Sequence, residues 1–186
     1  MRKAVFLDRD GVLIEQVAYL SRPEQTVLIP GAVEALKLIH RHGDVAVVIS
    51  NQSGVGRGYF TAADVDAVHD RIQQLLGVQG EAVDAFYYCP HAPSEACSCR
   101  KPSPEMILRA AERFDVDVHA SLMLGDRMSD LECGVNAGCA ASVLVLTGYG
   151  EEQSPKAREA GFAVARDMLA AVREFYGEKE MASMPS

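Results

Sequence analysis

Short apolar runs alternate with segments of helical periodicity along most of the chain. The apolar runs lie at 3–7, 44–50, 85–89, 121–126 and 141–148. Apolar residues recur at helical spacing in the segments 31–43, 61–77, 103–115, 128–138 and 167–176. The short runs are typical of buried strands and the periodic segments of amphipathic helices. We therefore predict an α/β fold with a doubly wound, mostly parallel sheet flanked by helices.

Residues with known terminal preferences mark the ends of several predicted helices. Thr61 is expected to cap the helix 61–77. Ser103 is expected to cap the next helix, with Pro104 at its first position. Gly138 is expected to end the helix that begins at Met128.

Composition narrows the class of protein. A length of 186 residues fits one domain, which we expect to span 1–177, with a disordered polar tail at 178–186. The net charge of −8 argues against nucleic acid or an anionic membrane as partner. The N-terminal sequence MRKAVFLDRDG has too short an apolar stretch for a signal peptide, so we expect a cytoplasmic protein. We also expect a monomer.

Polar residues follow four of the predicted strands. In an open parallel sheet, ligands bind at the carboxyl ends of the strands, so these residues should share one site. They are Asp8 and Asp10, then Ser50 and Asn51, then Arg100 and Lys101, and finally Asp126 and Asp130. Clustered carboxylates favour a hard cation such as Mg²⁺. A dication, a lysine and a hydroxyl together favour phosphoryl transfer, in which an aspartate can act as nucleophile.

Four sequence motifs carry a family resemblance. FLDRDGV, VVISNQSG, CRKPSPEM and LGDRMSD resemble, in order, the four motifs of haloacid dehalogenase-type phosphohydrolases. The resemblance covers nearly the whole chain. It implies a Mg²⁺-dependent phosphatase that works through an aspartyl phosphate.

The resemblance also implies a role for each motif residue. Asp8 would be the nucleophile and Asp10 the general acid and base, while Ser50 and Lys101 would bind the phosphoryl group. Mg²⁺ would be held by the side chains of Asp8 and Asp126 and by the backbone carbonyl of Asp10. Asp130 would lie outside the direct ligands of the metal.

A cysteine-rich loop precedes Lys101. Cys89, His91, Cys97 and Cys99 form the pattern Cys-x-His-x5-Cys-x-Cys. Four such ligands suit a structural, tetrahedral Zn²⁺ site. The alternative, a set of buried thiols, fits poorly with the proline and serine residues between them. We therefore predict a zinc ion that closes the loop and fixes its exit close to Lys101.

The short gaps between the motifs leave no room for a cap domain. The chain resembles the capless branch of the family that carries this zinc loop, and the resemblance implies removal of the 7-phosphate from D-glycero-D-manno-heptose 1,7-bisphosphate. The product would serve the synthesis of cell-surface glycans, lipopolysaccharide among them. The substrate contacts implied in this way are Gln16, Val17, Ala18, Tyr19, Ser50, Asn51, Gln52, Ser53, Arg100 and Arg127.

The charge pattern adds a second line of reasoning about substrate. Arg57, Arg100, Lys101 and Arg127 provide a local positive patch in an acidic chain, and a second phosphate needs such cations. Two alternatives remain at this point. A phosphatase for histidinol phosphate would share the capless fold and the zinc loop, and a zinc-knuckle module for RNA or protein would use the cysteine loop alone. Knuckles are basic, which this chain is not.

Overall fold

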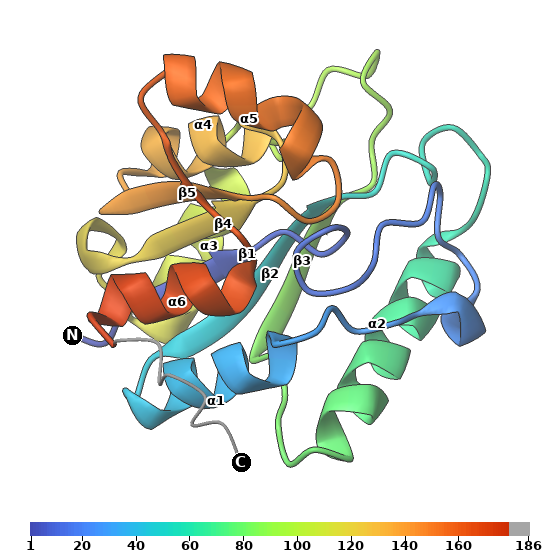
Figure 1. The fold of residues 1–186 in the computed structure, drawn as a ribbon. Coiled ribbons are helices and arrows are strands. Elements are labelled where there is room, and N and C mark those ends of the chain that lie inside the picture. The colour runs from blue at the N-terminus through green and yellow to red at the C-terminus, as the bar shows by residue number, and fades with distance from the viewer. Residues whose placement is uncertain (179–186) are drawn as a thin grey trace.

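A computed structural model describes residues 1–178 and contains one sheet of six parallel strands (Figure 1). The strands are β1 (Ala4–Leu7), β2 (Val45–Asn51), β3 (Ala85–Cys89), β4 (Leu122–Gly125), β5 (Ala141–Val145) and β6 (Ala163–Ala165). Their order in the sheet is β3-β2-β1-β4-β5-β6, with every pair parallel. The chain thus winds outward from β1 in both directions, as the alternating pattern predicts.

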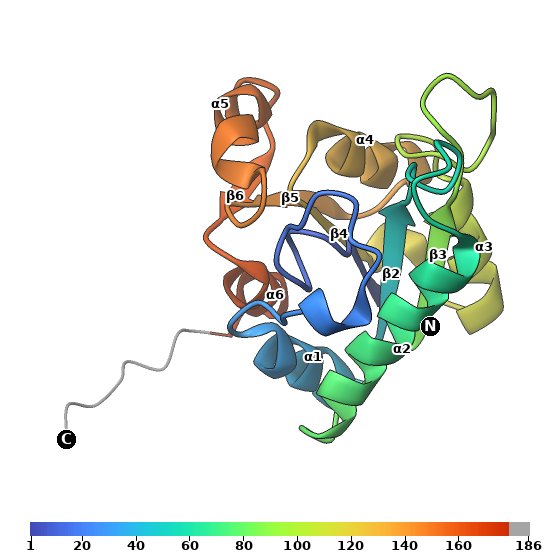
Figure 2. The same ribbon diagram turned by 90° about the vertical axis from the view of Figure 1, so that its right-hand side faces the viewer.

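Helices cover both faces of the sheet (Figure 2). They are α1 (Ala32–Arg41), α2 (Ala62–Gly77), α3 (Glu105–Phe114), α4 (Met128–Ala137), α5 (Gly150–Glu159) and α6 (Met168–Tyr176). Two short 3₁₀ turns lie at Pro23–Gln25 and Val118–Ala120. One core lies between the sheet and α1, α2 and α6, and a second between the sheet and α3 and α4; a smaller third cluster joins α4, β5 and α5. β1 alternates between them: Val5 and Leu7 enter the first, Ala4 and Phe6 the second.

Most predicted helix ends agree with the structure. Thr61 caps α2 in a capping box with Asp64, and Gly138 ends α4 with a φ of 85°. The predicted cap of α3 is wrong by one residue. Pro104 occupies the cap position and α3 begins at Glu105. The Ser103 hydroxyl, one residue before the cap position, still accepts a hydrogen bond from the Glu105 N–H at 3.4 Å and so pairs one of the free amides at the start of α3.

Besides the two 3₁₀ turns, one helix and one strand were not predicted. α5 is mostly polar, contains Pro155, and within its bounds buries only Gly150 and Ala157, so it lacks an apolar stripe. β6 has three residues, too few for a clear pattern. Both lie at the far edge of the sheet, away from β1.

The C-terminal end of the described chain packs against the domain. Glu178 lies beside α1, where its carboxylate contacts Arg41 and His42 at 3.4 and 3.3 Å. The rest of the predicted tail, 179–186, lies outside the described residues. Within residues 1–178 we find no cap domain, and no helix there combines the length and apolar character of a membrane span.

His40 on α1 supplies a pH-dependent contribution to stability. Its two ring nitrogens lie 3.1 Å from Asp84 and 2.7 Å from Glu81. The hydrogen bond to Asp84, aided by that to Glu81 and opposed by burial, raises the pKa of His40 from 6.5 to about 9. Because the folded pKa exceeds the unfolded value, this stabilisation is complete below pH 6.5 and is lost as the pH rises through about 9.

We therefore expect His40→Gln to lower the free energy of unfolding by about 1 kcal/mol near pH 6, after allowance for solvent screening. Near pH 10 the variant and the wild type should be equally stable. Urea unfolding at both pH values measures this. An equal difference at both values would show that the His40 charge contributes nothing.

Candidate active site

The carboxyl ends of β1, β2, β3 and β4 meet at a cleft of about 370 Å³. Its walls include every residue predicted to act on or contact substrate. These are Asp8, Asp10, Gln16, Val17, Ala18, Tyr19, Ser50, Asn51, Gln52, Ser53, Arg57, Arg100, Lys101 and Arg127. Asp130 also lines the cleft, and Asp126 lies fully buried beside it. The rule that strand ends share a site therefore brings distant segments of the chain together.

A cluster of three carboxylates and one lysine lies at the floor of the cleft, with Asp126 buried just beside it. Asp8, Asp126 and Asp130 each place an oxygen within 4.8 Å of the others. The Lys101 ammonium lies 2.8 Å from Asp8 Oδ1 and 2.7 Å from Asp130 Oδ1, and it donates to the Ile49 carbonyl at 2.7 Å. Lys101 is 3% exposed, so its three contacts hold it at one place.

Burial, together with the charges inside the cluster, shifts the pKa values of these groups. Burial, with the neighbouring Asp8 carboxylate, raises the pKa of Asp126 to about 7. Burial raises the pKa of Asp130 to about 6, against the opposing effect of Lys101. Burial alone would lower the pKa of Lys101, but the charges of Asp130 and Asp8 outweigh it and raise the pKa. One lysine thus faces three buried carboxylates.

The surroundings of Asp126 fit a small divalent cation. Its Oδ2 accepts a bond from the Tyr149 N–H at 2.8 Å, whereas its buried Oδ1 has no hydrogen-bond partner among the described residues. A Cβ atom on Gly11 or Gly148 would overlap Asp126, so both glycines are needed to enclose it. Carboxylate oxygens with unused lone pairs are the ligands that Mg²⁺ prefers.

Asp10 lies apart from this cluster. Its carboxylate accepts bonds from Arg9 Nε at 3.0 Å, Arg9 Nη2 at 3.1 Å and Gln52 Nε2 at 3.1 Å. Gln52 Nε2 also donates to Ser50 Oγ at 2.7 Å. The side chains of Asp10 and Ser50 are therefore joined through one carboxamide, and Gln52 as a whole is only 4% exposed.

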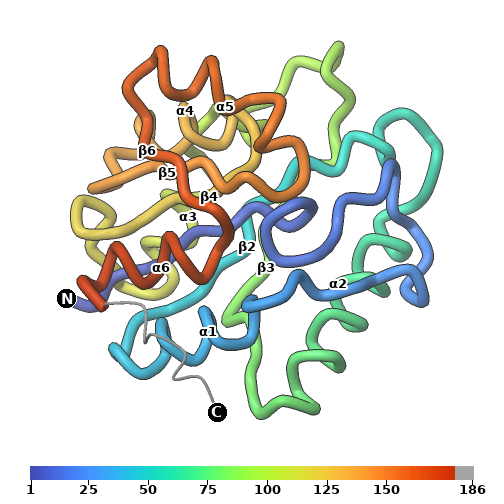
Figure 3. The backbone as a smooth tube through the Cα atoms, in the orientation of Figure 1, coloured from blue at the N-terminus to red at the C-terminus, as the bar shows by residue number. Residues whose placement is uncertain are grey.

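Cations and aromatic rings form the rim. The Arg127 guanidinium lies 3.8 Å from the centre of the Tyr149 ring, and Arg100 Nη1 donates to the His91 carbonyl at 3.3 Å. The loops after β1 and β2 come close together (Figure 3). Tyr19 of the first loop packs edge-on against Tyr59 of the second, with ring centres 4.8 Å apart. Tyr19 has a φ of 51°, which is rare for a tyrosine and fixes the direction of this loop.

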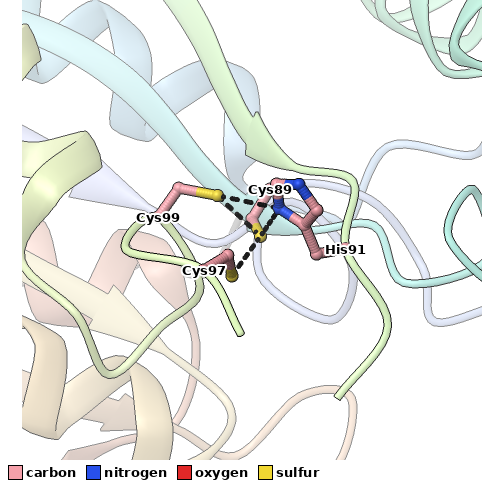
Figure 4. A group of neighbouring side chains, drawn as sticks. All are labelled: Cys89, His91, Cys97 and Cys99. Carbon is pink, nitrogen blue, oxygen red and sulfur yellow. Dashed lines mark hydrogen bonds between the residues drawn. The ribbon is translucent and has the colours of Figure 1, made fainter. Parts of the chain in front are cut away.

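The cysteine loop brings its four predicted ligands together (Figure 4). Cys89 Sγ lies 3.7 Å from Cys97 Sγ and 3.5 Å from His91 Nδ1, and His91 Nδ1 lies 3.3 Å from Cys99 Sγ. A tetrahedral zinc site has edges of about 3.8 Å between sulfurs. The 2.9 Å between Cys89 and Cys99 is shorter, so the group would expand by under about 1 Å to hold the ion.

Asn51 connects this loop to the floor of the cleft. Its Oδ1 accepts a bond from the Lys101 N–H at 3.0 Å, and its Nδ2 donates to the Lys101 carbonyl at 3.3 Å. The backbone of Lys101 is therefore held by β2 on one side and follows the cysteine cluster on the other. The Asn51 carboxamide is occupied by this contact, although the residue lines the cleft as predicted.

Some residues of the cleft were not predicted. They are Arg9, Leu20, Gly54, Phe60, Pro93, Ser129 and Tyr149. Two of them had a signal in the sequence. Arg9 lies between the two aspartates of the first motif, and Tyr149 follows the predicted strand 141–148, where the strand-end rule applies.

Comparison with known proteins adds an independent observation. A family model described as HAD-hydrolase-like matches residues 98–171. The D-glycero-β-D-manno-heptose-1,7-bisphosphate 7-phosphatase of Pseudomonas putida is 39% identical over 92% of this chain and 98% of its own. The corresponding α-heptose enzyme of Mycobacterium bovis is 36% identical over 94% of both chains. The crystal structure of the D,D-heptose 1,7-bisphosphate phosphatase of Bordetella bronchiseptica, complexed with magnesium and phosphate, has a TM-score of 0.87. It shares 35% identity over 95% of this chain and 99% of its own.

Proposed function

This chain belongs to the D-glycero-D-manno-heptose-1,7-bisphosphate 7-phosphatase family of haloacid dehalogenase-type hydrolases, and on that premise we propose that it removes the 7-phosphate of this sugar through an aspartyl phosphate on Asp8. The observation that carries the proposal is the floor of the cleft. Asp8, Lys101 and Ser50 line one cleft, and Asp8 forms an ion pair with Lys101 at 2.8 Å.

The reaction proceeds in two steps. In the first, an oxygen of Asp8 attacks phosphorus, the bond from phosphorus to the sugar oxygen breaks, and Asp10 gives a proton to the leaving alkoxide. In the second, water attacks the phosphorus of the aspartyl phosphate while Asp10 takes a proton from it. Free phosphate leaves and Asp8 is regenerated. Ser50 and Lys101 hold the phosphoryl oxygens through both steps.

The side chains of Asp8 and Asp126, with the backbone carbonyl of Asp10, would hold Mg²⁺. The unpaired Asp126 Oδ1 supports this assignment. When bound, the ion neutralises charge on the phosphoryl group and on the carboxylates around it. Asp130 contributes indirectly, because it positions the Lys101 ammonium at 2.7 Å.

Specificity for a bisphosphate rests on the rim. Arg57, Arg100 and Arg127 line the cleft beyond the reacting centre and would bind the second phosphate. Histidinol phosphate carries an amine and an imidazole in place of a second phosphate, and three arginines at the rim do not favour it. By name, the enzyme of Pseudomonas putida acts on the β anomer and that of Mycobacterium bovis on the α anomer, so the relatives of this chain include both specificities.

Steady-state phosphate release with Mg²⁺ tests the proposal. We expect kcat/KM for heptose 1,7-bisphosphate to exceed that for histidinol phosphate by about two decades or more, since one charge-assisted contact is worth about 1.5–3 kcal/mol and several are lost. A preference for histidinol phosphate would reject the substrate assignment and leave the phosphatase chemistry intact.

Arg100→Ala tests the second anion site directly. We expect kcat/KM for the 1,7-bisphosphate to fall by about 10- to 100-fold, because one bidentate contact is worth about 1.5–3 kcal/mol. For a heptose 7-monophosphate, which lacks the second phosphate, the loss should be much smaller. Arg158→Ala, an exposed position on α5, is the matched control. Equal losses on both substrates would mean that Arg100 does not contact the second phosphate.

The cysteine cluster makes a separate prediction about metal content. Purified protein should carry about one tightly held Zn²⁺ per chain, because four soft ligands leave the ion no open position. Cys97→Ser should release the ion and lower activity through misplacement of Lys101. Cys139→Ser, outside the cluster, should do neither. Active, folded protein that contains no zinc would contradict the assignment.

We further propose a domain extent, an oligomeric state, a compartment and a fate for the product. The domain would span 1–177 and act as a monomer in the cytoplasm. Its product, a heptose 1-phosphate, would pass to the synthesis of activated heptose for cell-surface glycans.

A further inference from the structure

Arg9 has an unusual environment for a charged side chain. It is 1% exposed and lies directly between the two aspartates of the first motif. Two of its nitrogens contact the Asp10 carboxylate, at 3.0 and 3.1 Å, and Nη2 also donates to Gln52 Oε1 at 3.0 Å. Burial of a guanidinium is costly, and Arg9 Nη1 has no hydrogen-bond partner among the described residues. A buried arginine that bears this cost indicates a specific role.

The contact with Arg9 determines which way the Gln52 carboxamide points. A guanidinium can only donate, so the atom that faces Arg9 must be the amide oxygen. The amide nitrogen must then face Asp10 Oδ2, at 3.1 Å, and Ser50 Oγ, at 2.7 Å. Because Ser50 Oγ accepts from this nitrogen, its own hydroxyl hydrogen is free to donate toward the cleft.

His69 lies near Arg9 but does not provide a second positive charge for the Asp10 carboxylate. His69 is buried and stacks on Phe86, with ring centres 4.2 Å apart. Burial, and then the charge of Arg9, lower the pKa of His69 to about 3. A neutral imidazole adds no positive charge beside Arg9, so the Asp10 carboxylate is held by Arg9 and Gln52.

We propose that Arg9 and Gln52 are positioning residues that aim the Asp10 carboxylate for proton transfer to the leaving group, an inference that rests on the proposed role of Asp10. Arg9 holds both carboxylate oxygens of Asp10. Gln52 fixes the separation between Asp10 and Ser50, and hence between the proton donor and the group that binds the phosphoryl oxygens. Without them Asp10 remains present but is no longer aligned with the alkoxide.

The leaving group distinguishes this role from simple structural support. A sugar alkoxide must be protonated as it leaves, whereas 4-nitrophenolate is a weak base and leaves without a proton. The value of kcat/KM reports the steps up to phosphoryl transfer. Loss of Asp10 alignment should therefore reduce kcat/KM for a sugar phosphate far more than for 4-nitrophenyl phosphate. A general loosening of the site should reduce both alike.

The test uses Gln52→Met and Arg9→Lys, assayed on 4-nitrophenyl phosphate and on the best sugar phosphate of a panel. We expect the ratio of kcat/KM, sugar phosphate over aryl phosphate, to fall by about 10-fold or more in each variant. Gln73→Met is the matched control, because Gln73 also bonds within the protein, to the Val83 backbone at 2.7 and 2.9 Å, away from the cleft. Ser50→Ala, which removes a phosphoryl contact, should lower both rates about equally.

Two results would overturn the inference: an unchanged ratio in folded Gln52→Met, or equal losses on the two substrates in Arg9→Lys. If either variant fails to fold, Gln52→Glu decides, since it keeps the acceptor for Arg9 and removes the donor to Asp10. Wild-type protein that hydrolyses other sugar phosphates but not heptose 1,7-bisphosphate would reject the proposed substrate without affecting this comparison.

Discussion

Asp8→Asn is expected to lower the rate of phosphate release by at least about 10⁴-fold while the fold stays intact. A neutral carboxamide cannot attack phosphorus, and no other described carboxylate holds the same place at the end of β1. The ion pair of Lys101 with Asp130, at 2.7 Å, persists in the variant and holds the lysine in position. Phosphate release and circular dichroism measure the two parts of the prediction.

The control for this experiment is Asp70→Asn, an exposed position on α2. It makes the same chemical change and should leave the rate unaltered. A folded Asp8→Asn protein that retains a tenth of wild-type activity would show that Asp8 is not the nucleophile.

Lys101→Met is expected to reduce both stability and rate. The lysine lies between Asp8 and Asp130 at 2.8 and 2.7 Å, and all three side chains are buried. Removal of one partner of a buried ion pair leaves uncompensated charge and costs about 3–5 kcal/mol. We expect a loss of this order in the free energy of unfolding without Mg²⁺, and a loss of about 10³-fold in kcat from the missing contact to the phosphoryl group.

A second substitution separates the two effects. Lys101→Met combined with Asp130→Asn removes one of the unpaired charges and should recover part of the stability but none of the activity. Lys156→Met, at an exposed position on α5, controls for the change in side chain. If Lys101→Met alone is as stable as the wild type, the lysine does not neutralise the carboxylate cluster.

The sequence can predict which residues meet at one edge of the sheet where backbone position alone determines their place. Asp8, Ser50 and Lys101 follow different strands, and a parallel sheet brings strand ends to one edge whatever the side chains do. The cysteine loop is similar, because the spacing of Cys89, His91, Cys97 and Cys99 limits how far apart they can lie.

The directions of side chains could not be predicted in this way. Asn51 and Gln52 were expected to contact substrate, and both line the cleft, yet their carboxamides bond Lys101 and Asp10. The position of Arg9 between two aspartates is visible in the sequence, and only the fold shows that its side chain is buried. The helix α5 could not be predicted because it is mostly polar and lacks an apolar stripe.

The most direct test of the account is to identify the residue that takes the phosphoryl group. In Asp10→Asn, 4-nitrophenyl phosphate can still transfer its phosphoryl group, but hydrolysis of the intermediate lacks its base and should be slow. Acid quenching followed by peptide mass analysis should then find one phosphoryl group on the peptide that contains Asp8, and none when Asp8→Asn is added. A burst of 4-nitrophenol without phosphorylated protein, or a phosphoryl group on the peptide that contains Ser50, would contradict the assignment of Asp8 as nucleophile.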